Sequence, residues 1–194
     1  MEIVLATSSP RRKELMNRLA ESFRIVPVDV DESSVAESDP ERFAMRAAAL
    51  KAETAAATHP DAIVIGADTV VTVEGRLLGK PADREDAKAM LELLSGRTHL
   101  VITGIALWHK SSNRSLVDRE VTAVTFRPLS VAMIDAYLDR GDFLDKAGAY
   151  AIQDVGKAFV SAIDGDYDNV VGFPISRVGE MLTQMLRDLP RLTV

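Results

Sequence analysis

Residues 1–19, MEIVLATSSPRRKELMNRL, decide how the fold begins. The apolar run from Ile3 to Ala6 predicts a short strand. Leu15, Met16 and Leu19 then recur at helical spacing, with Ser9 suited to cap the helix and Pro10 suited to its first position. A strand that leads directly into a helix is the building unit of an α/β sheet, so we expect an α/β fold.

Arg11 and Arg12 are unusual residues for the first turn of that helix. The turn already carries unpaired N–H groups and the positive end of the helix dipole, so each cation is disfavoured by several tenths of a kcal/mol. Two forked guanidinium groups next to helix N–H groups and the Ser9 hydroxyl predict a polyanion site, most simply a phosphate site. The alternative is that the arginines extend into solvent or pair with Glu14 and Glu21.

The rest of the chain alternates between helical and strand patterns. A capping box at Ser38 and Glu41 predicts the start of an Ala-rich helix. The strand 62–73 is expected to be interrupted near Gly66. The remaining expectations are strands at 22–30 and 157–163, a hairpin of 98–108 with 116–126, a turn at 164–169, and helices at 41–58, 84–94, 131–140 and 173–186, with caps at Asp83 and Ser130. Together they predict one α/β domain with a mixed sheet.

Composition narrows the classes of function. The 194 residues are 47% hydrophobic, carry a net charge of −6 and include no cysteine. The acidic balance argues against nucleic acid and anionic membranes as partners, and no apolar run is long enough to span a bilayer. Without cysteine, thiolate catalysis and Cys-ligated zinc are excluded. We expect a cytoplasmic enzyme or binding protein that lacks both the Walker-type loop and the G-x-G-x-x-G fingerprint.

Asp68 is the most unusual acidic residue, because it lies within the apolar run AIVIGADTVVTV. A buried carboxylate has to be paired, metal-bound or hydrogen-bonded. A turn at a strand end, where Asp68 accepts backbone N–H groups, explains it equally well. Lys51, Lys80 and Glu32 also have an ordinary explanation, since each is of a type that is usually solvated.

Five sequence blocks together resemble the Maf family. They are LATSSPRRKEL (5–15), GADTVV (66–71), LGKP (78–81), LSGRTHLVITG (94–104) and DKAGAYAIQ (145–153), in family order and at family-like separations. One block would be weak support, but five in order are highly specific. The similarity extends from Ile3 to the last helix.

The resemblance implies a fold and an activity. The fold is a single elongated domain, 1–194, of two lobes around a mixed sheet with a cleft between the lobes, similar to the inosine-triphosphate pyrophosphatases. The activity is cleavage of a nucleoside triphosphate to its monophosphate and pyrophosphate with a divalent metal, Mg²⁺ or Mn²⁺. Family members are often dimers, so a homodimer is expected.

The resemblance also implies roles for individual residues. Asp68 is expected to be the catalytic carboxylate and, with Glu32, a metal ligand. The remaining implied residues are Lys51, Lys80 and Glu32 in catalysis, Ser9, Arg11 and Arg12 on the phosphates, and Arg12, Thr69 and Gln153 in base specificity. Two positions depart from the family pattern: Thr7 replaces the usual Ser, and Asp154 replaces the usual Gly after Gln153.

The implied substrates are dTTP and UTP. DKAGAYAIQ and the downstream DGDYDNVVGFP resemble the family branch that acts on these nucleotides. The Gln153 amide offers both a donor and an acceptor to the edge of uracil or thymine. Two other classes of function remain open: a nucleotide-binding regulator of cell division without turnover, and a nucleic-acid-binding protein that uses SPRRK (9–13) as a basic patch.

Overall fold

The computed structural model describes residues 1–189, without the side chains of residues 33, 156 and 157. Within these residues seven strands form one sheet in the order β2-β1-β3-β5-β6-β7, with β4 beside β3. The strands are β1 (Ile3–Ala6), β2 (Arg24–Ile25), β3 (Ile63–Val73), β4 (Arg76–Leu78), β5 (Thr98–His109), β6 (Arg114–Phe126) and β7 (Val160–Asp164). The pairs β1·β2 and β1·β3 are parallel and the pairs β3·β4 and β6·β7 antiparallel, which confirms the predicted mixed sheet.

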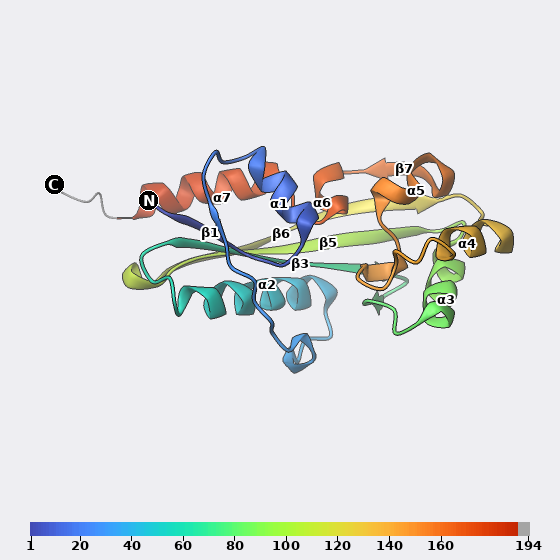
Figure 1. Cartoon of the computed structure of the whole chain (residues 1–194), viewed down its shortest axis with the longest axis horizontal. Helices are drawn as coiled ribbons and strands as arrows, with labels where there is room; N and C mark the ends of the chain where they lie inside the picture. Colours follow the sequence, from blue (N-terminus) through green and yellow to red (C-terminus); the bar gives the residue numbers. More distant parts are fainter. Residues whose placement is uncertain (190–194) are drawn as a thin grey trace. The chain divides into compact units, whose positions relative to one another are not determined.

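The helices are distributed along the whole chain (Figure 1). They are α1 (Pro10–Asn17), α2 (Pro40–Ala56), α3 (Arg84–Leu94), α4 (Val131–Leu138), α5 (Ile152–Phe159), α6 (Tyr167–Val171) and α7 (Ile175–Asp188), with three short 3₁₀ turns, η1 (Glu32–Ser34), η2 (Lys110–Ser112) and η3 (Ala147–Ala149). The chain divides into two compact units: residues 1–68, 103–120 and 172 onward, and residues 69–102 and 121–171. The single domain over 1–194 stays a prediction, and its last residues, 190–194, lie outside the described part.

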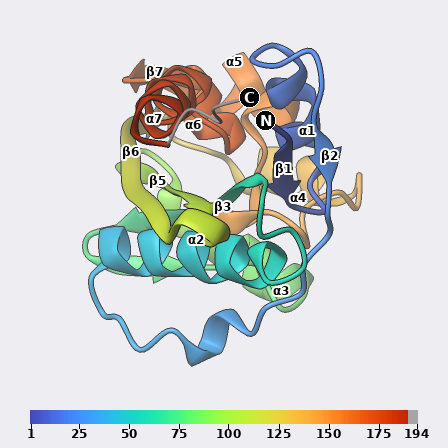
Figure 2. The same ribbon diagram turned by 90° about the vertical axis from the view of Figure 1, so that its left-hand side faces the viewer.

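In the first unit, α2 lies on one face of the sheet and α1 and α7 on the other (Figure 2). The small side chains of α2 let it pack closely on β3. Gly66 faces this helix, and a Cβ added there would overlap the Ala48 carbonyl oxygen and lie 2.7 Å from the Ala52 nitrogen. The predicted interruption at Gly66 is therefore wrong. The strand continues unbroken, and the glycine is required by the helix that crosses it.

Most helix caps follow the sequence prediction. Ser9, Asp83 and Ser130 each accept a backbone N–H at the start of a helix, from Arg12, Asp86 and Met133 respectively. The capping box at Ser38 and Glu41 is wrong. Asp39 immediately precedes Pro40 and caps α2, with Oδ1 accepting the Arg42 N–H at 2.9 Å.

The second unit contains elements that the sequence patterns did not show. Residues 76–78 form β4, a strand that was not expected from the sequence, and α6 begins at Tyr167, within the predicted turn at 164–169. Helix α5 precedes β7, so the strand expected from 157 begins only at Val160. Buried Ile152, Val155 and Phe159 are spaced as on one helical face, and this short repeat was not recognised.

The strand predicted at 22–30 is also shorter than expected. Only Arg24 and Ile25 pair with β1, which itself has four residues. The hairpin predicted for 98–108 and 116–126 agrees with the structure. Strands β5 and β6 are neighbours in the sheet and are connected through η2 and Asn113.

Candidate active site

The parallel pairing of β1 and β3 brings two predicted site segments to one edge of the sheet. Ala6 pairs with Gly66, and because the two strands are parallel, the residues that follow each of them continue in the same direction. The chain after β1 forms the loop to α1, and β3 continues to Asp68. Ligands of α/β sheets collect at such carboxyl edges. The predicted phosphate segment and the predicted catalytic carboxylate thus belong to one region of the first unit.

Lys51 links the two predicted acidic residues. Its Nζ donates to Oδ1 of Asp68 at 2.5 Å and to Oε1 of Glu32 at 2.7 Å. The side chains of Lys51 and Asp68 are only 12% and 8% exposed, whereas that of Glu32 is 36% exposed. The structure therefore rules out a solvated Lys51. Asp68 is paired within β3, and the strand-end turn is also wrong, because Asp68 lies in the middle of an eleven-residue strand.

The close packing of α2 on β3 makes this ion-pair cluster possible. Lys51 lies on α2 between Ala48 and Ala52, the two residues whose backbone atoms approach Gly66. Asp68 lies two residues after Gly66, and residues two apart in a strand line the same face. Asp68 therefore lies on the face that α2 covers. The glycine thus brings the base of Lys51 close enough for its ammonium group to reach Asp68.

Arg12, on α1, interacts electrostatically with the same cluster. Its Nε donates to the Gly172 carbonyl oxygen at 2.9 Å. Burial lowers the pKa of the Arg12 guanidinium from its usual value and the nearby Arg11 acts in the same direction, whereas Asp68 and Glu32 raise it. An arginine keeps its charge under such a shift. Arg12 is therefore held in place rather than extended into solvent.

The loop before α1 is ordered by its hydroxyl groups. Thr7 is 5% exposed, and its Oγ1 accepts the Ser9 N–H at 3.1 Å. Ser9 in turn caps the helix through the Arg12 N–H at 3.4 Å. Threonine at position 7 keeps the hydroxyl that serine would supply, so this departure from the family pattern preserves the hydrogen bond.

The first unit thus combines three cationic and two acidic side chains, Arg11, Arg12, Lys51, Glu32 and Asp68. Their formal sum is +1, which suits a polyanion. The carboxylate oxygens of Asp68 and Glu32 are also the hard donors that Mg²⁺ and Mn²⁺ prefer, so these two residues fit a divalent ion. Among residues 1–189, no three His, Asp or Glu side chains converge on a point that could hold a metal.

Thr69, Lys80 and Gln153 belong to the second unit, and their roles stay predictions. Thr69 is half-buried in β3, Lys80 is exposed after β4, and Gln153 is exposed in the first turn of α5. Asp154 also lies in this first turn. A helical backbone accepts any L-residue, so the missing family glycine does not distort the segment that carries Gln153.

Sequence reasoning missed Gly172, whose carbonyl group holds Arg12. Gly172 has φ +113°, a conformation that side-chain-bearing residues rarely adopt. The sequence NVVGFP (169–174) contained a sign of this special backbone, because its glycine separates an apolar run from Phe-Pro. The hydrogen bond itself could not be predicted, because its donor and acceptor lie 160 residues apart in the sequence.

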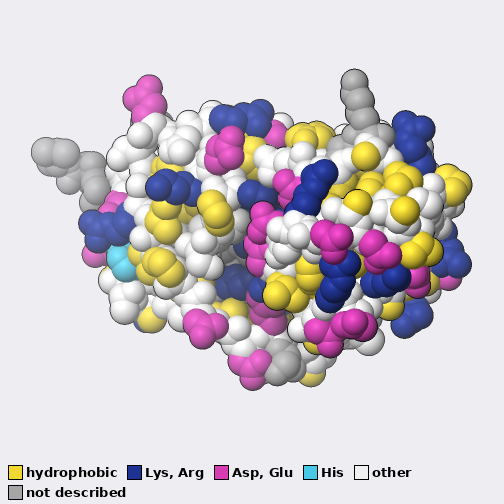
Figure 3. Space-filling view, turned by 45° about the vertical axis from the view of Figure 1, so that its right-hand side comes forward, with side chains coloured by type: hydrophobic (Ala, Val, Ile, Leu, Met, Phe, Trp, Pro, Cys, Tyr) yellow, Lys and Arg dark blue, Asp and Glu magenta, His cyan; other side chains and the backbone are white. Residues whose placement is uncertain are grey.

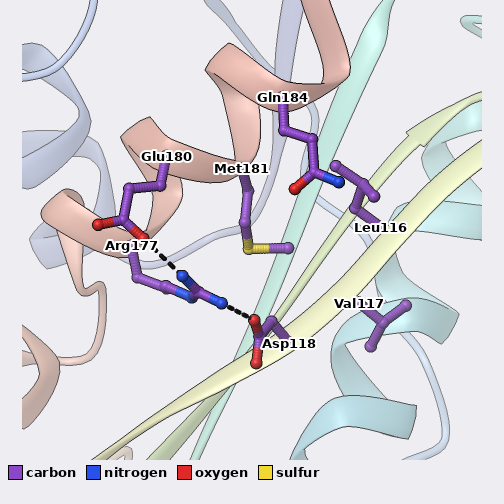
Figure 4. A pocket seen from close by; sticks show the side chains of 7 residues that line it. All are labelled: Leu116, Val117, Asp118, Arg177, Glu180, Met181 and Gln184. Carbon is purple, nitrogen blue, oxygen red and sulfur yellow. Dashed lines mark hydrogen bonds and ion pairs between the residues drawn. The ribbon is translucent and has the colours of Figure 1, made fainter. Parts of the chain in front are cut away.

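A separate cavity of about 230 Å³ lies between β6 and α7 in the first unit (Figure 4). Arg177 lines this cavity, and its guanidinium group pairs with Asp118 and, at 2.5 Å, with Glu180. Its other lining residues are Leu116, Val117, Met181 and Gln184. The cavity contains none of the predicted site residues.

The surface carries charges of both signs. On the face shown in Figure 3, Lys and Arg side chains are interspersed with Asp and Glu. The net charge of −6 argues against the basic-patch alternative. None of the helices in the described residues is both long and apolar enough to cross a membrane.

Comparison with known proteins gives a consistent result. The model of a family described as Maf-like protein matches residues 2–185. A dTTP/UTP pyrophosphatase of Symbiobacterium thermophilum is 46% identical over 183 residues, which are 94% of this chain and 93% of the relative. A dTTP/UTP pyrophosphatase of Bacillus anthracis is 46% identical over 188 residues, 97% of each chain.

Solved structures agree on the fold. A HAM1 protein from Coxiella burnetii has a TM-score of 0.55 at 18% identity, covering 95% of this chain and 99% of its own. The Staphylococcus aureus Ham1 protein has a TM-score of 0.56 at 17% identity, covering 95% and 100%. The match to the family model and the two full-length relatives establish that this chain belongs to the Maf family.

Proposed function

We propose that this protein is a nucleoside triphosphate pyrophosphatase that hydrolyses dTTP and UTP to the monophosphate and pyrophosphate. The relatives that match nearly the whole chain carry this name. The observation that carries the proposal is the pairing of Asp68 and Glu32 through Lys51, next to Arg12. Attack of water on a phosphate anion requires a carboxylate that orients the water and cations that stabilise the negative charge, and this cluster contains both.

The chemistry is attack of water on the α-phosphorus. Negative charge builds on the departing pyrophosphate, and Arg11, Arg12 and Lys51 supply the positive groups that stabilise it. Asp68 orients the attacking water or accepts its proton. Ser9 and the N–H groups at the start of α1 bind phosphate oxygens, and Lys80 adds a further cation.

Asp68 and Glu32 would hold the divalent metal. Family members use such an ion, and when bound it neutralises phosphate charge and polarises the reacting phosphoryl group. The same Asp68 can serve the metal and the water. We propose Mg²⁺ or Mn²⁺, because both prefer oxygen donors.

Arg12, Thr69 and Gln153 are the proposed determinants of base specificity. Uracil and thymine present two carbonyl acceptors on either side of one N–H donor, and the Gln153 amide can match an adjacent acceptor and donor. A site built to pair these groups rejects a base with another pattern, since its own polar groups would be left unpaired. Gln153→Ala should therefore lose base discrimination more than rate on the best substrate.

A nucleotide panel tests the proposal. We expect kcat/KM to be high for dTTP and UTP, intermediate for CTP, and low for ATP and GTP, with pyrophosphate as the product. A clear preference for 7-methyl-GTP would instead place the protein in the other branch of the family. Tight nucleotide binding without pyrophosphate release would favour the non-catalytic regulator of cell division.

The proposal includes a cytoplasmic homodimer, as the family resemblance implies. Sedimentation equilibrium at micromolar concentration tests the oligomeric state. A species of 21.1 kDa at every concentration would contradict the dimer.

A further inference from the structure

Lys51 occupies the position between the two carboxylates that fit a divalent ion. Its Nζ lies 2.5 Å from Asp68 Oδ1 and 2.7 Å from Glu32 Oε1, and both bonds are charge-assisted. With Lys51 12% and Asp68 8% exposed, little water screens this contact. A cation that bridges these same two oxygens has to displace the ammonium group.

The surrounding charge makes this displacement harder for a bare ion. Arg12 interacts electrostatically with Asp68, Glu32 and Arg11. Together with Lys51, these five charged side chains have a formal sum of +1. Such a site repels a free divalent cation. It attracts the same cation when the ion arrives bound to a triphosphate, because that complex is an anion.

We propose that Lys51 acts as an internal counter-ion, which prevents Asp68 and Glu32 from binding a divalent metal until a nucleotide brings it. The inference rests on the proposed pyrophosphatase function. When the metal–nucleotide complex enters, the Lys51 ammonium group leaves the carboxylates and pairs with a phosphate oxygen. Two ionic contacts within the protein are exchanged for contacts with substrate, and the metal is not held in the absence of substrate.

The residue type suits this exchange. Lysine carries a compact charge with three donors on a flexible four-carbon stem, so Nζ can move between acceptors while the backbone stays in α2. Arginine at the same position would present a planar guanidinium group, which forms fixed bidentate bonds with carboxylates and is less suited to moving between carboxylate and phosphate acceptors. The buried base of the side chain restricts the movement to the ammonium end.

Binding of Mn²⁺ without nucleotide tests the inference. Electron paramagnetic resonance measures free Mn²⁺ during titration of three proteins: the wild type, Lys51→Met and the double variant Lys51→Met with Asp68→Asn. Lys88→Met is the matched control, since Lys88 pairs with a single carboxylate, Asp135, at 3.0 Å in the second unit. Circular dichroism establishes that each variant folds.

We expect Lys51→Met to bind Mn²⁺ at least tenfold more tightly than the wild type, and the double variant to lose this gain. Lys88→Met should match the wild type. With the non-hydrolysable α,β-methylene analogue of dTTP present, the wild type should bind Mn²⁺ at least tenfold more tightly than without it. Added Mn²⁺ should also raise the melting temperature of nucleotide-free Lys51→Met more than that of the wild type.

Equal Mn²⁺ affinity of the wild type and Lys51→Met would overturn the inference. Wild-type turnover of dTTP, measured separately as pyrophosphate release, would show whether the proposed function survives that result. If Lys51→Met does not fold, Lys51→Gln removes the same charge while keeping a hydrogen-bonding side chain, and the same affinity difference is expected of it.

Discussion

Replacing Gly66 by alanine tests how the fold builds the site. The new Cβ would overlap the Ala48 carbonyl oxygen and lie 2.7 Å from the Ala52 nitrogen and 3.1 Å from the Ala52 Cβ. Normal contacts between such atoms begin near 3.5 Å, so α2 would have to withdraw by about 1 Å. Since the obstacles are backbone atoms, side-chain rotation cannot relieve them. We expect a loss of about 3 kcal/mol in the free energy of unfolding, at the upper end for overpacked cores.

Urea unfolding followed by circular dichroism measures this loss. Gly79→Ala is the matched control, because no atom lies within 4 Å of a Cβ added there, and its stability should stay equal or rise slightly. The withdrawal of α2 should also lengthen the bond from Lys51 to Asp68, so the remaining folded Gly66→Ala protein should have reduced kcat for dTTP. A Gly66→Ala protein as stable and active as the wild type would refute the packing argument.

Three further predictions concern single side chains. Burial lowers the pKa of His99 to about 4, below the 6.5 of an unfolded chain, so only the unfolded state binds a proton between these values. Stability should therefore fall as pH decreases from 6.5 towards 4, by about 2 kcal/mol at pH 5, and thermal melts of His99→Asn should lack this component. Arg12→Lys keeps the charge but removes the Nε bond to Gly172, so KM for dTTP should rise at least fivefold in steady-state assays. Arg177→Ala breaks partly exposed ion pairs, so urea unfolding should show a loss of less than about 1 kcal/mol with unchanged turnover.

The local features of the fold were readable from sequence because their causes are local. Ser9, Asp83 and Ser130 cap helices through donors only three residues away, and the apolar spacing around them is regular. The capping box at Ser38 failed for an equally local reason. A competing cap, Asp39, stood one residue later and directly preceded the proline.

The features that the sequence did not reveal depend on contacts between distant segments. Gly66 suggests a break when the strand is considered alone, and only the close approach of α2 shows why glycine is required there. Lys51 on an Ala-rich helix suggests a solvated side chain until β3 places Asp68 within 2.5 Å of its ammonium group. The family resemblance supplied the candidate residues, and the tertiary packing supplied the bonds among those in the first unit.

The position of bond cleavage tests the central claim most directly. Wild-type protein and a divalent metal are incubated with dTTP in water labelled with oxygen-18, and the products are identified by mass spectrometry. The account predicts dTMP and pyrophosphate in equal amounts, with one labelled oxygen in the phosphate of dTMP and none in pyrophosphate, and loss of both products in Asp68→Asn. Label in pyrophosphate, or release of dTDP with inorganic phosphate, would contradict attack at the α-phosphorus.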